Sequence, residues 1–185
     1  MDRIYIDFDG VIVDTIEKIV SLYNEDFKFY KNFEPASWMD VNSWNFEELS
    51  LASPEYINMY FNIPRFFQGL RLMDNAYEAL KKISEKYDIV IVSAGTYSNL
   101  ELKKLWIHKH LPFVAEFIGV DINTYYDKSH IDMEGSIFID DSYSNLVSST
   151  ADEDICFGDI YNWNKEWTGT RIMNWYDVIR YLKIR

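Results

Sequence analysis

The stretch that most constrains the fold is IYIDFDGVIVD, residues 4–14, which lies close to the start of the chain. An apolar run leads directly into two aspartates, Asp7 and Asp9, and apolar residues then resume. A short apolar run of this kind is typical of a buried strand. Because two carboxylates placed side by side repel each other, the end of this strand needs a compensating positive charge nearby.

Helices are predicted at four further places. After the first strand, apolar residues recur at helical spacing and Asp14 is placed to cap them: Ile16, Ile19, Val20 and Tyr23. A second helix is predicted over 75–86. A capping box at Ser98 and Glu101 predicts the start of a third, which runs to about residue 110. The last helix carries Trp175, Val178, Ile179 and Leu182.

Short apolar strands alternate with these helices. The clearest is a continuous β-branched run at 89–93, typical of a strand buried on both faces. Others are predicted at 117–120, 137–140 and 155–157. This alternation predicts an α/β fold in which a Rossmann-like parallel sheet is flanked by helices.

One segment differs in composition from the rest. Residues 24–67 contain 12 aromatic side chains among 44 residues, prolines interrupt them, and no clean period lasts more than two turns. We therefore expect a small, mostly helical cap over 24–67, inserted after the first strand and its helix. The core is then formed by residues 1–23 and 68–185.

Residues with reactive or ligand-binding side chains lie where the predicted strands end. They are Asp7 and Asp9, then Ser93 and Ala94, then Asp140 and Asp141, with Lys128 in the loop before the strand at 137–140. Ligands of open parallel sheets bind beyond the carboxyl ends of the strands. A lysine, a hydroxyl and four carboxylates are thus expected at one rim. An oxygen-only set without a second cysteine or a histidine pair favours Mg²⁺.

Each of these motifs also has an ordinary structural explanation. The Asp-x-Asp-Gly of residues 7–10 can be a turn, Ser93 with Gly95 can cap the next helix, and Asp140 can cap the helix after it. What favours function is their occurrence in order at successive strand ends.

Charge and composition exclude several classes of partner. The formal net charge of -12 disfavours binding to a nucleic-acid backbone. The richest basic stretch, Lys103, Lys104 and Lys109, is interpreted as a solvated helix face. No apolar run approaches the roughly 18 residues that cross a bilayer, and Cys156 is the only cysteine. We expect a cytoplasmic protein that binds neither nucleic acid nor membrane, and a homodimer is compatible with the sequence.

The motifs together resemble those of the haloacid dehalogenase-like (HAD-like) phosphatase superfamily in order and relative position. Longer stretches are similar to the 5'(3')-deoxyribonucleotidase family: 7–14, IPRFF at 63–67, KKLWIHKH at 103–110, Asp127–Lys128, FIDD at 138–141 and the tail at 162–175. The resemblance covers most of the chain outside the aromatic insertion. The sequence departs from the pattern at Thr15, where an aromatic residue is expected, and at Tyr97, where a lysine is expected.

The resemblance implies roles for the carboxylates. Asp7 would attack phosphorus and become an aspartyl phosphate, and Asp9 would protonate the leaving oxygen and then activate water. Mg²⁺ would be held by the Asp7 carboxylate, the backbone carbonyl of Asp9 and the Asp141 carboxylate. Asp140 would support the waters of the metal.

The remaining residues would bind the phosphate and the rest of the substrate. Ser93 and the amide of Ala94 would donate to phosphate oxygens, and Lys128 would balance charge. Lys103 is a further candidate for the same anionic site. In the cap, we expect one or two rings to contact substrate among Trp44, Phe46, Phe66 and Phe67, although rings at this density also form core.

The function expected from these residues is that of a magnesium-dependent phosphatase. Its substrates would be ribo- or deoxyribonucleoside monophosphates, which it would hydrolyse to nucleoside and phosphate. The alternative is a HAD-like phosphatase that acts on a sugar phosphate or another small metabolite and shares every catalytic residue. A binding protein that has lost activity is disfavoured, because the set of reactive residues is intact.

Overall fold

A computed structural model describes residues 2–184 of the chain. Its strands are β1 (Asp2–Ile6), β2 (Tyr87–Gly95), β3 (Glu116–Asp121), β4 (Ile137–Asp140), β5 (Glu153–Phe157) and β6 (Thr170–Ile172). Its α-helices are α1 (Thr15–Phe27), α2 (Pro54–Tyr60), α3 (Pro64–Phe67), α4 (Ala76–Ile83), α5 (Tyr97–His110), α6 (Tyr143–Ser148) and α7 (Trp175–Tyr181). A short 3-10 helix, η1, spans Trp38–Asp40.

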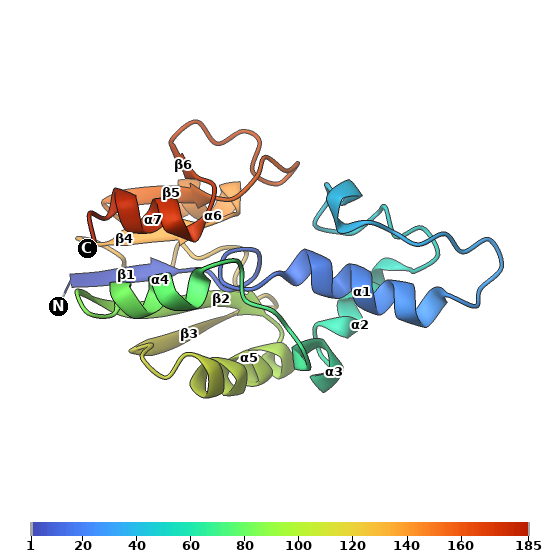
Figure 1. The fold of residues 1–185 in the computed structure, drawn as a ribbon. Helices are drawn as coiled ribbons and strands as arrows, with labels where there is room; N and C mark the ends of the chain where they lie inside the picture. Colours follow the sequence, from blue (N-terminus) through green and yellow to red (C-terminus); the bar gives the residue numbers. More distant parts are fainter. Residues whose placement is uncertain (1, 185) are drawn as a thin grey trace.

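The six strands form one parallel sheet in the order β3-β2-β1-β4-β5-β6, with helices packed against it (Figure 1). This confirms the predicted fold class. The chain builds outward from β1 through β2 to β3, then returns to place β4 on the other side of β1. The winding reverses between β1 and β4, and the crevice at such a switch point is where open α/β sheets bind ligands.

The two faces of the sheet are covered by different apolar clusters, because successive side chains of a strand point to opposite sides. On one face, Ile4 and Ile6 pack with residues of α4, α5 and α7. On the other, Tyr5 packs with Val90, Phe138 and residues of α6 and the loop before β4. None of the helices within residues 2–184 combines the length and the apolar character that crossing a bilayer requires.

The aromatic-rich segment lies beyond the end of the sheet. Figure 1 shows α1 pointing away from the strands, with α2 and α3 beside it. α1 runs without a break through the expected boundary at residue 24 and ends at Phe27. Between α1 and α2 the segment is mostly irregular apart from η1, so the expectation of a mostly helical cap is wrong for residues 28–53. Buried side chains such as Phe46 and Leu49 join this segment to the core cluster.

Two further local predictions differ from the structure. The capping box at Ser98 is wrong, because α5 begins at Tyr97 and Thr96 caps it by accepting a hydrogen bond from the backbone N–H of Asn99. The edge strand β6 was not predicted, since its three residues are too few to show a period.

The loop that follows β1 is held from several sides. The backbone N–H of Gly10 donates to the carbonyl of Val13 at 3.0 Å. The fully buried indole of Trp175 donates to the carbonyl of Val11 at 2.9 Å. The N–H of Met73 donates to the carbonyl of Ile12, also at 2.9 Å. The turn after β1 is thus fixed by packing from α7 and from the segment before α4.

Trp175→Ala is expected to destabilise the protein by about 3–5 kcal/mol, because it removes a large buried ring and leaves the Val11 carbonyl without its donor. Tyr176→Ala is the control, since Tyr176 lies on the same helix and is 65% exposed. Urea unfolding of both variants checks the prediction. Equal small losses would contradict the anchoring role of Trp175.

Candidate active site

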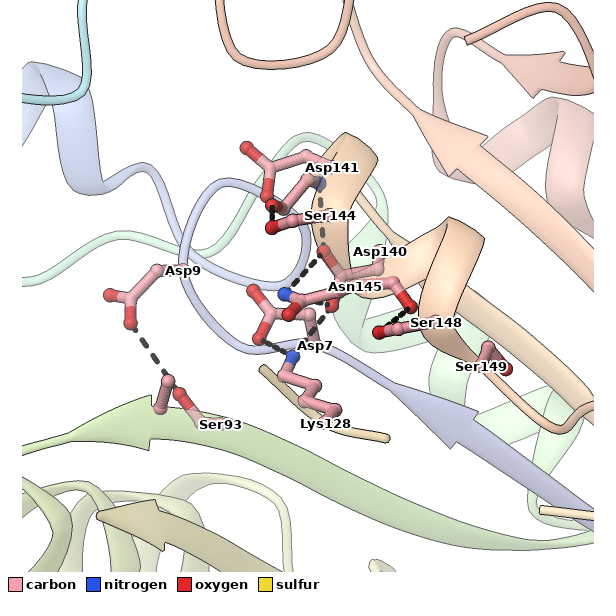
Figure 2. A network of polar contacts seen from close by, with 12 residues as sticks. Asp7, Asp9, Ser93, Lys128, Asp140, Asp141, Ser144, Asn145, Ser148 and Ser149 are labelled. Atoms are coloured by element: carbon pink, nitrogen blue, oxygen red, sulfur yellow. Dashed lines mark hydrogen bonds and ion pairs between the residues drawn. The ribbon is translucent and has the colours of Figure 1, made fainter. Parts of the chain in front are cut away.

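Lys128 lies at the centre of the charged residues beyond the sheet. Its ammonium nitrogen is 2.5 Å from Oδ1 of Asp7 and 2.6 Å from Oδ2 of Asp140, and the side chain is 1% exposed. Figure 2 shows this ammonium between the two carboxylates, one from the end of β1 and one from the end of β4. The structure therefore brings together three predicted site residues from distant parts of the chain.

Asp140 has no exposed surface and is saturated with hydrogen bonds. Besides Lys128, it accepts from the backbone N–H of Ser142 at 2.7 Å and from the amide of Asn145 at 3.1 and 3.2 Å. It does not line the cavity described below. Its contacts fix Lys128 and the start of α6.

Asp9 is held by three donors. Thr15 donates to Oδ1 at 2.8 Å, the ammonium of Lys103 lies 2.5 Å from Oδ2, and the hydroxyl of Ser93 donates to Oδ2 at 3.5 Å (Figure 2). Lys103 also donates to the hydroxyl of Ser93 at 2.8 Å and to the carbonyl of Ala94 at 2.9 Å.

Lys103 is therefore not on a solvated helix face, and that interpretation is wrong for this residue. The side chain is 1% exposed and points into the site from α5. The prediction treated the three lysines as one group, but only Lys104 and Lys109 of that group are exposed on the helix. The structure places Lys103 beside Asp9, Ser93 and Ala94. The sequence also makes Lys103 a candidate for this anionic site.

Asp141 lines the same cavity as Lys103 and is 7% exposed. Its Oδ2 accepts a hydrogen bond from the indole N–H of Trp163 at 3.0 Å. A side chain at Gly10 would collide with it, since a Cβ there would lie 2.7 Å from the same oxygen. Gly10 also has a φ of 72°, which favours glycine. Both constraints explain why glycine follows the Asp7–Asp9 pair.

Negative charge exceeds positive charge in this buried cluster. Burial, together with the charges of Asp140 and Asp9, raises the pKa of Asp7 to about 7 although Lys128 opposes the shift. Burial and the charges of Asp140 and Asp7 also raise the pKa of Asp141 well above its usual value. For Lys128, burial alone would lower the pKa, but the charges of Asp140 and Asp7 outweigh it and raise it.

This imbalance fits a divalent cation. Four buried carboxylates face two buried ammonium groups, so two negative charges stay uncompensated when all are ionised. Among residues 2–184, no three acidic, histidine or cysteine side chains are grouped so that they alone could hold a metal. A set of two carboxylates, Asp7 and Asp141, with a backbone carbonyl and water matches what Mg²⁺ accepts, since it keeps several waters.

A cavity of about 440 Å³ opens in front of these residues, a size suited to a small-molecule ligand. Asp7, Asp9 and Asp141 form its floor. Its walls combine aromatic rings with uncharged polar side chains: Trp44, Phe61, Trp163, Asn58, Asn62, Thr96, Asn99 and Asn145.

Of the four rings expected to contact substrate, the structure places Trp44 alone on this cavity. Phe46 and Phe66 are 2% and 0% exposed and belong to the apolar core, and Phe67 packs against that core. Phe61 and Trp163 line the cavity but were not predicted. Phe61 stood among many aromatic residues of the cap. Trp163 lies in the connection after β5, within the stretch 162–175, for which the sequence predicted no site residue.

The segment 24–67 touches the rest of the site at two places. The backbone N–H of Asn162 donates to the carbonyl and the side-chain oxygen of Asn42, at 3.3 and 3.0 Å. On the other side, the amide of Asn99 donates to the carbonyl of Phe61 at 2.6 Å, and Thr96 donates to Asn62. These contacts close the cavity from above the carboxylates.

The family profile of "5' nucleotidase, deoxy (Pyrimidine), cytosolic type C protein" matches residues 2–185. A 5'(3')-deoxyribonucleotidase of Clostridium acetobutylicum is 28% identical over 175 residues, 93% of this chain and 89% of that protein. One of Bacillus subtilis is 25% identical over 187 residues, 97% of each. A Staphylococcus epidermidis relative is 31% identical over 117 residues, but the match spans 61% of its length, less than two-thirds.

Solved structures share the fold at low sequence identity. A haloacid dehalogenase-like family hydrolase from Streptococcus pneumoniae superposes with a TM-score of 0.64 at 15% identity, covering 98% of both chains. A Bacillus subtilis protein assigned to the HAD hydrolases and solved with bound magnesium gives 0.66 at 13% identity, covering 100% of this chain and 99% of that one. The predicted resemblance is confirmed: the chain has a HAD-like fold and belongs to the deoxyribonucleotide-type cytosolic 5' nucleotidase family.

Proposed function

We propose that this phosphoric monoester hydrolase is a magnesium-dependent phosphatase of ribo- or deoxyribonucleoside monophosphates, which it hydrolyses to nucleoside and phosphate through an aspartyl phosphate on Asp7. One observation carries the proposal. A buried cluster of four carboxylates and two lysines presents Asp7, Asp9, Asp141 and Lys103 to a cavity whose walls are aromatic and amide side chains. The floor suits a phosphate with its cation, and the walls suit a planar base.

Asp7 is the proposed nucleophile because it is the carboxylate of the cluster that combines access to the cavity with an ion pair to Lys128. Lys128 binds one carboxylate oxygen of Asp7, Oδ1, and this contact fixes the orientation of the other oxygen. Attack on phosphorus would form the aspartyl phosphate and release the nucleoside, which splits one difficult hydrolysis into two displacements. Lys128 would stabilise the negative charge that gathers on the phosphoryl oxygens.

Asp9 is the proposed acid and base. It lies on the cavity, two residues from the nucleophile, and Thr15 and Lys103 fix its two oxygens. It would give a proton to the leaving oxygen and then remove one from the water that attacks the aspartyl phosphate. Ser93, the Ala94 amide and Lys103 would bind the phosphate oxygens at the end of β2.

The proposed holders of Mg²⁺ are Asp7, the backbone carbonyl of Asp9 and Asp141. Asp140 would act indirectly, by holding Lys128 beside Asp7. Bound there, the cation would supply charge that offsets the repulsion between an anionic nucleophile and an anionic phosphate. The excess of buried negative charge supports this assignment.

We propose the division of the chain into a core, residues 1–23 and 68–185, and a cap, residues 24–67. The cap would cover the phosphate and offer Trp44 and Phe61 to the base, while Trp163 completes the wall from the core.

A cytosolic family description supports a cytoplasmic location. The proposed partner is the nucleotide itself, and neither nucleic acid nor membrane is needed.

Asp7→Asn is expected to abolish turnover and leave the fold intact, because it removes a nucleophile while it preserves the shape of the side chain and leaves Lys128 paired with Asp140. Initial rates with a nucleoside monophosphate, together with the melting temperature, check this. Activity within tenfold of the parent would contradict the nucleophile assignment.

Treatment with a chelator is expected to abolish hydrolysis, and added Mg²⁺ should restore it, since oxygen ligands hold this ion reversibly. The assay compares nucleotides and sugar phosphates before and after chelation. Full turnover by chelator-treated protein would show that the metal assignment is wrong.

Asp9→Asn is expected to impair hydrolysis of nucleotides more than that of p-nitrophenyl phosphate, whose leaving group needs little protonation. Mg²⁺ binding should persist, because the proposed contact is the backbone carbonyl. The measurement is kcat/KM on both substrates, and equal losses on the two would count against Asp9 as the acid.

Trp44→Ala is expected to lower kcat/KM for nucleotides by the equivalent of about 1–3 kcal/mol, roughly 5- to 150-fold, since a base would lose a stacking partner. Hydrolysis of ribose 5-phosphate should scarcely change. The matched control is Phe66→Ala, which removes a ring from the core of the same segment and should cost about 3–5 kcal/mol of stability. Uniform loss on both substrates in Trp44→Ala would favour the sugar-phosphate alternative.

A further inference from the structure

We infer that Trp163 is a positioning residue for the divalent cation: its indole N–H holds the carboxylate of Asp141 in the orientation that the cation needs. The inference deepens the proposed function and rests on it. Trp163 lies in the connection between β5 and β6, within the stretch 162–175, for which the sequence predicted no site residue.

The four carboxylates of the site differ in their partners. Asp7 and Asp140 pair with the ammonium of Lys128, and Asp9 pairs with that of Lys103. Among residues 2–184, Asp141 has no ion pair within 4.0 Å. Its partner is the neutral indole of Trp163, at 3.0 Å from Oδ2.

A neutral donor has a specific advantage at this position. An indole N–H donates one hydrogen bond and carries no charge. An ammonium group there would orient the carboxylate but would also repel a divalent cation and cancel part of the attraction that binds it. The hydrogen bond from Trp163 fixes Asp141 and leaves its negative charge for the cation.

Within residues 2–184, one oxygen of Asp141 accepts a hydrogen bond and the other does not. Oδ2 lies between the indole N–H and Gly10, whose backbone is too close to accept a Cβ. In the part of the chain that the structure describes, Oδ1 accepts no hydrogen bond. The residue lines the cavity with Asp7 and Asp9, so this oxygen is available at the cavity floor.

The indole is itself held in place. Its ring stacks on Tyr161 with centroids 4.2 Å apart and an angle of 3° between the planes. Trp44 packs against it edge-on from the cap, with centroids 5.5 Å apart. The loop is fixed by Asn164, which is fully buried, accepts from the N–H of Tyr161 at 3.0 Å and accepts at its carbonyl from Arg171 at 2.9 Å.

The test is the affinity for Mg²⁺ in the absence of substrate, measured by isothermal titration calorimetry. Trp163→Phe keeps a ring against Tyr161 and Trp44 but removes the N–H. We expect it to weaken binding of Mg²⁺ by roughly 10- to 100-fold, the usual effect of losing a group that orients a metal ligand. Raising the concentration of Mg²⁺ should then restore hydrolysis.

The matched control is Trp167→Phe. Trp167 lies in the same connection, and its indole donates to the carbonyl of Thr170 at 2.9 Å, away from the carboxylates. We expect it to bind Mg²⁺ as the parent does. Unchanged affinity in Trp163→Phe, or equal losses in the two variants, would overturn the inference while the metal requirement of the parent stands.

The parent protein supplies a second measurement that needs no variant. In ¹H–¹⁵N NMR spectra, the indole N–H resonance of Trp163 should shift as Mg²⁺ is added, while that of Trp167 stays in place. A Trp163 resonance that does not respond although Mg²⁺ binds would overturn the inference alone. A parent protein that binds no Mg²⁺ in the calorimeter would overturn both the inference and the metal part of the proposed function.

Discussion

The two ion pairs of Lys128 are the interaction on which the rest of the site depends. They join the ends of β1 and β4, the two strands between which the winding of the sheet reverses. A charge buried this completely is costly unless it is paired, and removal of one partner of a buried pair typically costs about 3–5 kcal/mol. The register of β1 against β4 thus fixes where Asp7 and Asp140 stand, and the loop carrying Lys128 must close over them.

One lysine cannot neutralise every carboxylate at this point, and the remaining charge explains the chemistry of the site. Asp140 is saturated by Lys128, Ser142 and Asn145 and turns away from the cavity. The excess negative charge therefore falls on Asp7 and Asp141, whose pKa values are raised. Those two face the cavity, so the cation and the phosphate that we propose would bind at the same place. Asp140, which holds Lys128, and Asp141, which faces the cavity, are consecutive in the sequence.

Local patterns in the sequence predicted the parts of the site that depend on local structure. Asp7, Asp9 and Asp140 follow apolar strands, and parallel strands bring their carboxyl ends to one rim. The burial of Lys103 was not predictable in this way, because α5 places charged residues around most of its circumference and shows no clean apolar face. Trp163 meets Asp141 only through the tertiary fold. Composition also did not separate the cavity ring Trp44 from the buried rings of the same segment.

The central claim is that Asp7 carries the phosphoryl group between the two displacements. The most direct test is to quench the enzyme during steady turnover of a nucleoside monophosphate, reduce the acyl phosphate with borohydride, and map the product by peptide mass spectrometry. Reduction converts a phosphorylated aspartate to homoserine, and the account predicts this change at position 7 with Asp9 unmodified. Reduction at Asp9 or at another carboxylate, or unmodified Asp7 in enzyme quenched while it is turning over, would contradict it.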